Sequence, residues 1–275
     1  MIGASGIDWD DAFDNGGYIR DAASYPDDWA ARAQAFRQAA VRAELDIAYG
    51  PSDRERCDLF QPEGAALGLV VFVHGGYWQK FDKAYWSHLA AGALALNWSV
   101  ALPNYTLAPE ATLPGMVAEI GRAIEVLSNR VTGPIHLAGH SAGGHLVTRM
   151  ICETSPLPHE VRDRIARVVS ISGLHDLRPL RLHQMNANLK LTEETAAAES
   201  AALLAPASTA RVTAWVGGKE RPEFLRQSAV LAESWSRQGV EADLVVEPGR
   251  HHFDVIEGLQ DPAHPLTLAL TGGNR

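Results

Sequence analysis

The chain has 275 residues, of which 46% are hydrophobic and 21% are charged. This composition is that of a globular protein with a sizeable core and excludes a disordered chain. With 24 Lys and Arg against 33 Asp and Glu, the formal net charge of −9 argues against nucleic acid or an anionic membrane surface as a partner.

Targeting and redox signals are sparse. The best apolar run, residues 67–73, is far shorter than the roughly 18 residues of a membrane span, so no membrane partner is expected. Residues 1–6 lack a basic region followed by an apolar stretch, so no signal peptide is expected. Cys57 and Cys152 are expected to be buried free thiols. We therefore expect a cytoplasmic protein with a single domain over residues 1–275.

The first part of the chain predicts a helix, a hairpin and a buried strand. Apolar residues at helical spacing indicate a helix over residues 27–42. Alternating apolar and polar residues predict short strands at 45–49 and 57–59, with turn residues between them. The run 67–73 is apolar throughout, which is typical of a strand covered on both faces of a parallel sheet.

After this run, strands and helices alternate. The predicted strands cover residues 99–102, 135–138, 168–171, 212–216 and 242–246, and the predicted helices cover residues 86–94, 116–127, 143–151 and 224–237. This alternation predicts βαβ crossovers and a three-layer α/β sandwich, a mostly parallel central sheet with helices on both faces. Residues 177–205 are rich in Leu and Ala without a predicted strand, and we expect a small helical lid insertion there.

The segment GHSAG at residues 139–143 matches the G-x-S-x-G pattern of a nucleophile elbow. It follows a predicted strand and precedes a predicted helix, so the chain must turn sharply, and side chains at the flanking positions would collide with neighbouring backbone. We expect Ser141 to be a nucleophile held above the sheet edge, with a helix N-terminus behind it. A plain strand-to-helix turn is the alternative.

The segment HGGYW at residues 74–78 follows the most apolar strand. Consecutive glycines let backbone N–H groups approach a ligand closely, so this segment is expected to form an oxyanion hole. The residues assigned to this hole are Gly75, Gly76, Tyr77 and Ala142. His74 is expected to be structural, bonded to nearby backbone. A glycine-rich strand exit without a ligand is the alternative.

The base and the acid are expected in the loops after the last two strands, because strand-end loops converge at the carboxyl edge of such a sheet. His252 follows the last strand and is favoured as the base over His251. Glu220 lies in the loop before it and is favoured as the acid. Glu223 is expected in the first turn of the following helix, and Asp176 is the runner-up acid.

Further side chains at the strand ends are candidates for a substrate pocket. These are Trp78, Tyr105, His140 and Phe253. No metal site is expected, because His136 and His140 are four residues apart but have no third ligand placed near them. No cofactor is expected.

Together these motifs resemble the α/β-hydrolase superfamily and, within it, the kynurenine formamidase (arylformamidase) group of serine hydrolases. Other segments that match this group are residues 49–50, 58–62, 104–109, 172–177 and 222–228. The resemblance covers most of the chain but not the expected lid. It implies the α/β-hydrolase fold with Ser141 as nucleophile, His252 as base and Glu220 where the group usually has an acidic Asp.

The resemblance also implies an activity. A metal-independent serine hydrolase is expected, cleaving a formyl or other short acyl group from a small-molecule amide or ester through a Ser-His-Glu triad. A general carboxylesterase of short-chain esters is the nearest alternative. A third hypothesis is a non-catalytic ligand-binding protein of the same fold.

Overall fold

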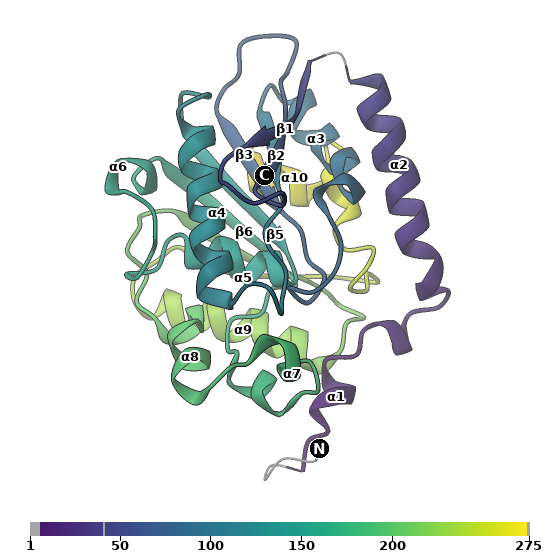
Figure 1. The fold of residues 1–275 in the computed structure, drawn as a ribbon, viewed down its shortest axis with the longest axis vertical. Coiled ribbons are helices and arrows are strands. Elements are labelled where there is room, and N and C mark those ends of the chain that lie inside the picture. Colours follow the sequence, from purple (N-terminus) through teal and green to yellow (C-terminus); the bar gives the residue numbers. More distant parts are fainter. Residues whose placement is uncertain (1–5, 41, 274–275) are drawn as a thin grey trace.

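An eight-stranded sheet runs through the centre of the computed structural model, which describes residues 6–40 and 42–273 (Figure 1). Residues 1–5, part of the segment where no signal peptide is expected, lie outside the described range. The strands are β1 (Ala43–Ala48), β2 (Arg56–Phe60), β3 (Leu69–Val73), β4 (Ser99–Pro103), β5 (Ile135–His140), β6 (Ile165–Ile171), β7 (Arg211–Gly217) and β8 (Ala242–Glu247).

The strand order is β1-β2-β4-β3-β5-β6-β7-β8. The hairpin of β1 and β2 is antiparallel, and β2 pairs antiparallel with β4. All later pairs, from β4–β3 to β7–β8, are parallel. The carboxyl ends of β3, β5, β6, β7 and β8 therefore meet at one edge of the sheet, where ligands bind in open α/β sheets.

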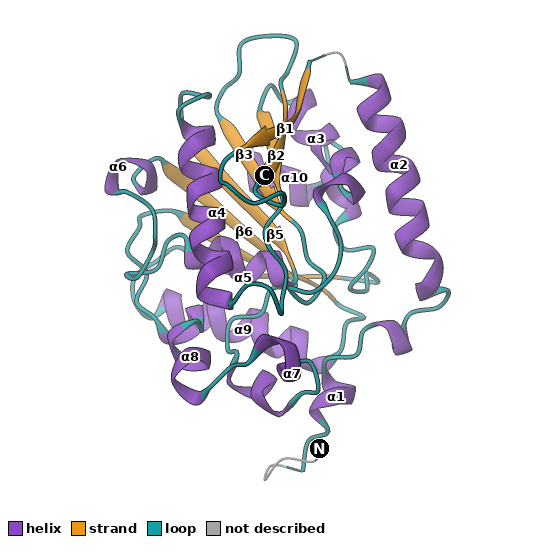
Figure 2. Ribbon diagram, viewed as in Figure 1, coloured by secondary structure: helices purple, strands orange, loops and turns teal. Residues whose placement is uncertain are grey.

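Helices cover both faces of the sheet (Figure 2). The helices are α1 (Trp9–Ala12), α2 (Tyr25–Ala39), α3 (Ala91–Ala95), α4 (Leu113–Ser128), α5 (Ala142–Arg149), α6 (His159–Arg162), α7 (Asn186–Leu189), α8 (Glu193–Ala198), α9 (Pro222–Ser236) and α10 (Pro265–Thr271). One core packs α4, α5 and α9 against the sheet, and the other packs α2, α3 and α10 against the opposite face.

Strand β3 shows how the apolar run builds both cores. Leu69, Val71 and Val73 belong to the core under α4, α5 and α9, whereas Val70 and Phe72 belong to the core under α2, α3 and α10. All five side chains are buried, and burying each contributes roughly 1.5–3 kcal/mol. The expected mostly parallel sheet with helices on both faces is thereby confirmed.

Some strands and helices begin or end at other residues than the sequence predicts, because polar or turn residues extend them. Strand β5 runs on to His140, so part of the GHSAG motif is strand. The helix expected at 86–94 begins as a 3₁₀ turn over Ser87–Ala90 before α3. Helix α10 was not expected. It begins after His264, whose side chain accepts a hydrogen bond from the N–H of Leu266.

The segment at residues 177–205 consists of α7, α8 and 3₁₀ turns at Arg178–Leu182 and Ala201–Leu203. A buried ion pair joins Glu199 to Arg149 in α5 at 2.9 Å. The Nε2 of His145, also in α5, donates to the carbonyl oxygen of Glu199 at 2.9 Å. The segment is thus anchored to α5. Its role as a lid and the single-domain organisation stay predictions.

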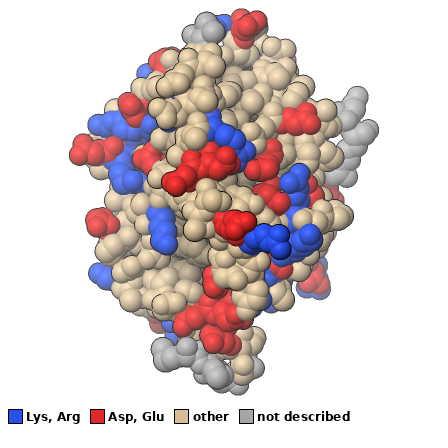
Figure 3. All heavy atoms as spheres, turned by 90° about the vertical axis from the view of Figure 1, so that its right-hand side faces the viewer, with Lys and Arg blue, Asp and Glu red and all other residues tan. Residues whose placement is uncertain are grey.

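None of the described helices is both long enough and apolar enough to cross a bilayer. Figure 3 shows acidic and basic side chains interspersed over the side of the molecule that is on the right in Figure 1, without a continuous basic patch on this view.

Buried histidines predict how the stability of the fold depends on pH. Burial lowers the pKa of His74, His88 and His136 to about 4, and that of His145 and His175 to about 3, from an ordinary value of 6.5. Between pH 6.5 and about 4 the unfolded chain therefore binds protons that the folded chain does not. Above pH 6.5 these histidines do not lower the free energy of unfolding. As the pH is lowered from 6.5 to about 4, each of them lowers the free energy of unfolding by up to about 1.4 kcal/mol per pH unit.

Urea unfolding at several pH values between about 7.5 and 5 measures this slope. His136 offers a matched variant, because its side chain is buried and its ring centroid lies 4.1 Å from that of Trp98. His136→Phe removes one of the titrating groups and is expected to make the slope shallower. A free energy of unfolding that stays constant or rises as the pH falls below 6.5 would contradict the prediction.

Candidate active site

Ser141 stands at the turn between β5 and α5 with φ 54° and ψ −115°, a conformation that non-glycine residues rarely adopt. The flanking glycines allow this turn. A Cβ on Gly139 would lie 2.1 Å from the carbonyl oxygen of Gly143, and a Cβ on Gly143 would lie 2.0 Å from that of Val73. Only glycine fits at these two positions. The structure thus places Ser141 on a strained turn between a strand and a helix, as the motif predicted.

The segment after β3 lies directly against this turn. A Cβ on Gly75 would lie 3.0 Å from the Cβ of Ser141, and Gly76 has a φ of 110°. The backbone N–H groups of Gly76, Tyr77 and Ala142 make no hydrogen bond with any described residue. Unpaired N–H groups from the segment after β3 and from the first residue of α5 therefore lie beside Ser141, an arrangement that suits the binding of a developing oxyanion.

Glu220 and His252 form a short hydrogen bond from two neighbouring loops. The Nδ1 of His252 donates to Oε2 of Glu220 at 2.6 Å, and the Glu220 side chain is fully buried. The other carboxylate oxygen accepts from the Ser172 hydroxyl at 2.5 Å and from the Gly217 N–H at 2.7 Å. Because both oxygens have partners, the carboxylate holds the imidazole in one tautomer and one orientation.

The rivals of His252 and Glu220 have other partners. The Nε2 of His251 lies 3.1 Å from the hydroxyl of Tyr25, and its Nδ1 lies 3.3 Å from a carboxylate oxygen of Asp254. Asp176 pairs with Arg178 at 2.8 Å. The structure does not bring these groups to Glu220 or to His252.

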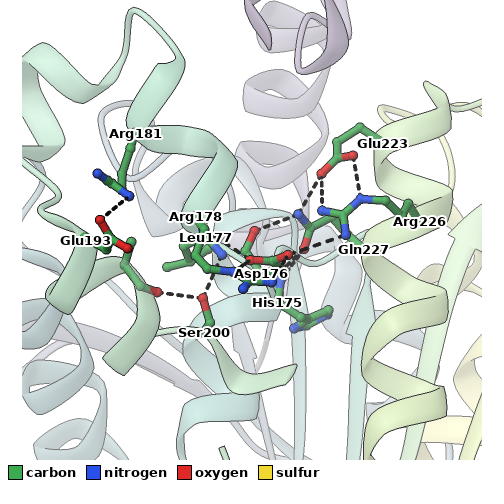
Figure 4. A network of polar contacts seen from close by, with 11 residues as sticks. His175, Asp176, Leu177, Arg178, Arg181, Glu193, Ser200, Glu223, Arg226 and Gln227 are labelled. Atoms are coloured by element: carbon green, nitrogen blue, oxygen red, sulfur yellow. Dashed lines mark hydrogen bonds and ion pairs between the residues drawn. The ribbon is translucent and has the colours of Figure 1, made fainter. Parts of the chain in front are cut away.

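Figure 4 shows where Asp176 and Glu223 lie instead. The side-chain oxygen of Gln227 accepts hydrogen bonds from the backbone N–H groups of His175 and Asp176, each at 2.7 Å. Its Nε2 donates to Glu223, which also pairs with Arg226 at 2.7 Å. A carboxylate oxygen of Asp176 lies 3.5 Å from the guanidinium of Arg226 in α9. Both carboxylates therefore attach the loop after β6 to α9.

Ser141 and His252 line the same pocket, with a volume of about 330 Å³. Neither the Ser141 hydroxyl nor Nε2 of His252 has a hydrogen-bond partner among the described residues, so both are open to a substrate. The other lining residues are Asp14, Gly16, Ala22, Ala23, Pro26, Trp29, Gly75, Gly76, Tyr77, Lys80, Phe81, Trp86, His140 and Phe253. The expected pocket residues His140 and Phe253 are thus brought to the site.

Aromatic rings form much of the pocket wall. The ring centroid of Trp29 lies 4.7 Å from that of Trp86, 5.4 Å from that of Phe253 and 5.9 Å from that of Phe81. Trp29 lies near the N-terminal end of α2, far from Ser141 in the sequence. The helical spacing of Trp29, Ala33 and Phe36 predicts only a helix, and nothing in the sequence indicates that Trp29 lines a pocket.

The N-terminal segment, residues 14–29, supplies six of the residues that line the pocket. The Tyr77 hydroxyl donates to the carbonyl oxygen of Phe13 at 3.2 Å, and the guanidinium of Arg221 stacks on the ring of Tyr18 at 3.6 Å. Arg221 also pairs with Asp11. These contacts hold the segment over the pocket, whereas residues 177–205 do not line it.

Two expected pocket residues lie elsewhere and correct the sequence interpretation. Trp78 has a φ of 59° and is buried in the core, with its ring edge-on to His145 at 5.4 Å. The ring of Tyr105 stacks on His74 at 4.6 Å, and its hydroxyl donates to the His74 carbonyl at 3.1 Å. Both rings support the HGGYW segment from the core side. As expected, His74 bonds to nearby backbone, donating from Nδ1 to the Gly75 carbonyl at 2.7 Å.

Residues 70–255 match the family described as alpha/beta hydrolase fold. The chain therefore belongs to the α/β-hydrolase fold family. It is similar to the kynurenine formamidase of Salmo salar, with 30% identity over 236 residues that cover 82% of this chain and 80% of that protein. The resemblance indicated by the motifs is thereby confirmed.

Solved structures agree with this assignment. A protein of Silicibacter sp. TM1040, described as a candidate thioesterase, is 49% identical, with a TM-score of 0.93 over 97% of this chain and 100% of that chain. Esterase B of Lactobacillus rhamnosis is 18% identical, with a TM-score of 0.67 over 90% of each chain, and shares the fold. With these relatives, the chain is a hydrolase rather than a non-catalytic protein of the same fold.

The partners of Glu220 predict which carboxylate the activity needs. Glu220→Gln keeps the size of the side chain but removes the charge that holds His252, so kcat is expected to fall by about 10³-fold or more. Asp176→Asn serves as the matched control, because this carboxylate pairs with arginines outside the pocket. Steady-state kinetics on folded variants, verified by circular dichroism, decide the matter. A larger loss in Asp176→Asn than in Glu220→Gln would show that the acid is misassigned.

Proposed function

We propose that this hydrolase removes a formyl or other short acyl group from an amide or ester with an aromatic leaving group, as an arylformamidase does. The observation that carries the proposal is the 2.6 Å bond between His252 and Glu220, with the free Nε2 of His252 and the Ser141 hydroxyl lining one pocket. Similarity to a kynurenine formamidase supports the amide, and the aromatic wall supports an aromatic leaving group.

In the proposed mechanism, the Ser141 hydroxyl attacks the carbonyl carbon while Nε2 of His252 takes its proton. Glu220 stabilises the imidazolium that forms. The carbonyl oxygen becomes an oxyanion bound by N–H groups of the HGGYW segment and of Ala142, each donor contributing about 10²–10³-fold in rate. The leaving group departs with the proton from His252, and water then releases the acyl group from Ser141 by the same route.

A small acyl group is supported by the rigid surroundings of Tyr77. This ring lines the pocket, and its hydroxyl is fixed by hydrogen bonds to the Phe13 carbonyl at 3.2 Å and the Asn15 side chain at 3.4 Å. A formyl group has no CH₂ groups whose burial would contribute about 0.8 kcal/mol each. Selectivity for it must therefore come from excluding longer acyl groups.

A second candidate is the hydrolysis of short-chain esters or thioesters. It is favoured by the 49% identity to the Silicibacter protein described as a candidate thioesterase. The same serine, histidine and oxyanion hole would serve both candidates, which differ only in the leaving group. Both candidate functions act on a small molecule. The cytoplasmic location of the protein stays a prediction.

The proposed nucleophile predicts a simple labelling result. A fluorophosphonate is expected to label Ser141 stoichiometrically, located by mass spectrometry of the digested protein. Ser141→Ala is expected to lose the label and about 10⁴-fold or more in kcat while remaining folded. A label on another residue, or an active Ser141→Ala variant, would refute the serine-hydrolase mechanism.

The pocket also predicts an order of acyl groups. With a common aryl leaving group, kcat/KM is expected to fall from formyl to acetyl to butyryl, because each added methylene meets the fixed wall. Tyr77→Ala is expected to flatten this order. Leu67→Ala is the control, because its side chain is 58% exposed and does not line the pocket. Wild-type protein that prefers butyryl or longer acyl groups would instead favour a general carboxylesterase.

A further inference from the structure

His140, the residue before Ser141, lies between the HGGYW segment and His252. Its Nε2 is 2.9 Å from the backbone carbonyl oxygen of His252, and the two imidazole rings are 4.6 Å apart. A carbonyl oxygen can only accept a hydrogen bond, so Nε2 of His140 carries the hydrogen. This bond fixes the ring at the wall of the pocket, where His140 is one of the lining residues.

The other ring nitrogen of His140 is a free acceptor beside the nucleophile. Burial, with a smaller effect of His252, lowers the pKa of His140 well below its ordinary value of 6.5, so the ring is neutral and Nδ1 keeps its lone pair. Nδ1 makes no hydrogen bond with any described residue. It lies 3.2 Å from the point where a Gly75 Cβ would be, and the Ser141 Cβ lies 3.0 Å from the same point.

An acceptor at this place distinguishes amides from esters. The leaving nitrogen of a secondary amide carries a hydrogen, whereas the leaving oxygen of an ester carries none. In a pocket walled by aromatic rings, an amide N–H that loses its bond to water needs a new acceptor, or the enzyme forfeits binding of that substrate. None of the four rings Trp29, Phe81, Trp86 and Phe253 supplies such an acceptor in its plane.

We propose that Nδ1 of His140 accepts a hydrogen bond from the N–H of the scissile amide and thereby selects amides over esters. This inference rests on the proposed function. When the tetrahedral intermediate collapses, the C–N bond breaks and Nε2 of His252 returns to the nitrogen lone pair the proton that it took from Ser141. The original N–H stays directed at His140. The leaving group departs as a neutral primary amine, and Ser141 retains the acyl group as an ester.

The test compares three substrates with the same formyl group: formanilide, N-methylformanilide, which lacks the N–H, and phenyl formate. They are assayed with wild-type protein, His140→Gln and His140→Leu. Leu removes both the N–H donor to the His252 carbonyl and the acceptor, whereas Gln keeps an N–H donor and also carries an acceptor oxygen, Oε1. The readout is the ratio of kcat/KM for formanilide to that for phenyl formate.

This ratio is expected to fall by about tenfold or more in His140→Leu, because the amide N–H loses its acceptor, and by less in His140→Gln, which keeps an acceptor oxygen. Wild-type protein is expected to prefer formanilide over N-methylformanilide. In His140→Leu this preference is expected to shrink by a similar factor. Phenyl formate hydrolysis shows in the same assay that each variant is folded. A merely structural role, exerted through the His252 carbonyl, would lower both activities in parallel and leave the ratio unchanged.

An unchanged ratio in His140→Leu overturns the proposal. Wild-type protein that cleaves phenyl formate but not formanilide also overturns it, while the hydrolase mechanism stands. Cleavage of neither substrate by wild-type protein refutes the proposed function itself, and the inference with it.

Discussion

The backbone crowding at the turn between β5 and α5 is the constraint on which the rest of the site depends. Gly139 and Gly143 have no room for a Cβ, because neighbouring carbonyl oxygens lie 2.1 and 2.0 Å from where it would be. Ser141 keeps an unfavourable backbone conformation that costs of order 1–3 kcal/mol, offset by the burial of every residue of α5. Since the carbonyl near Gly143 belongs to Val73, the same contact brings the end of β3, and with it the unpaired N–H groups of Gly76 and Tyr77, beside Ser141.

The other residues of the site lie along the carboxyl edge of the parallel sheet, next to this turn. The residue after β6, Ser172, and the last residue of β7, Gly217, both donate to Glu220, which in turn holds His252 from the loop after β8. The last residue of β5, His140, donates to the backbone of His252. Each neighbouring strand therefore contributes one contact to the pair. A buried carboxylate with all these donors is satisfied without a cation, so its charge is available to the imidazole.

Local sequence patterns were enough to predict most of the sheet and part of the site. The apolar run of β3 and the G-x-S-x-G pattern are each visible within a few consecutive residues of the sequence, so periodicity and motif spacing could predict them. The pocket wall could not be predicted in this way. Trp29 reaches it through the packing of a distant N-terminal segment. Trp78 misses it because a positive φ, set by the turn after Gly76, directs its ring into the core. Ser172 likewise belongs to no catalytic motif, and only the tertiary structure brings it to Glu220.

The strained turn presents Ser141 to the N–H groups of the HGGYW segment and of Ala142. A crystal structure of the protein after reaction with a small aryl phosphonate would show whether these groups bind a developing oxyanion. We expect phosphorus bonded to the Ser141 Oγ and a phosphoryl oxygen within about 2.7–3.1 Å of the Ala142 nitrogen and of a nitrogen of the HGGYW segment. A phosphoryl oxygen directed at solvent, or an adduct on another residue, would contradict it.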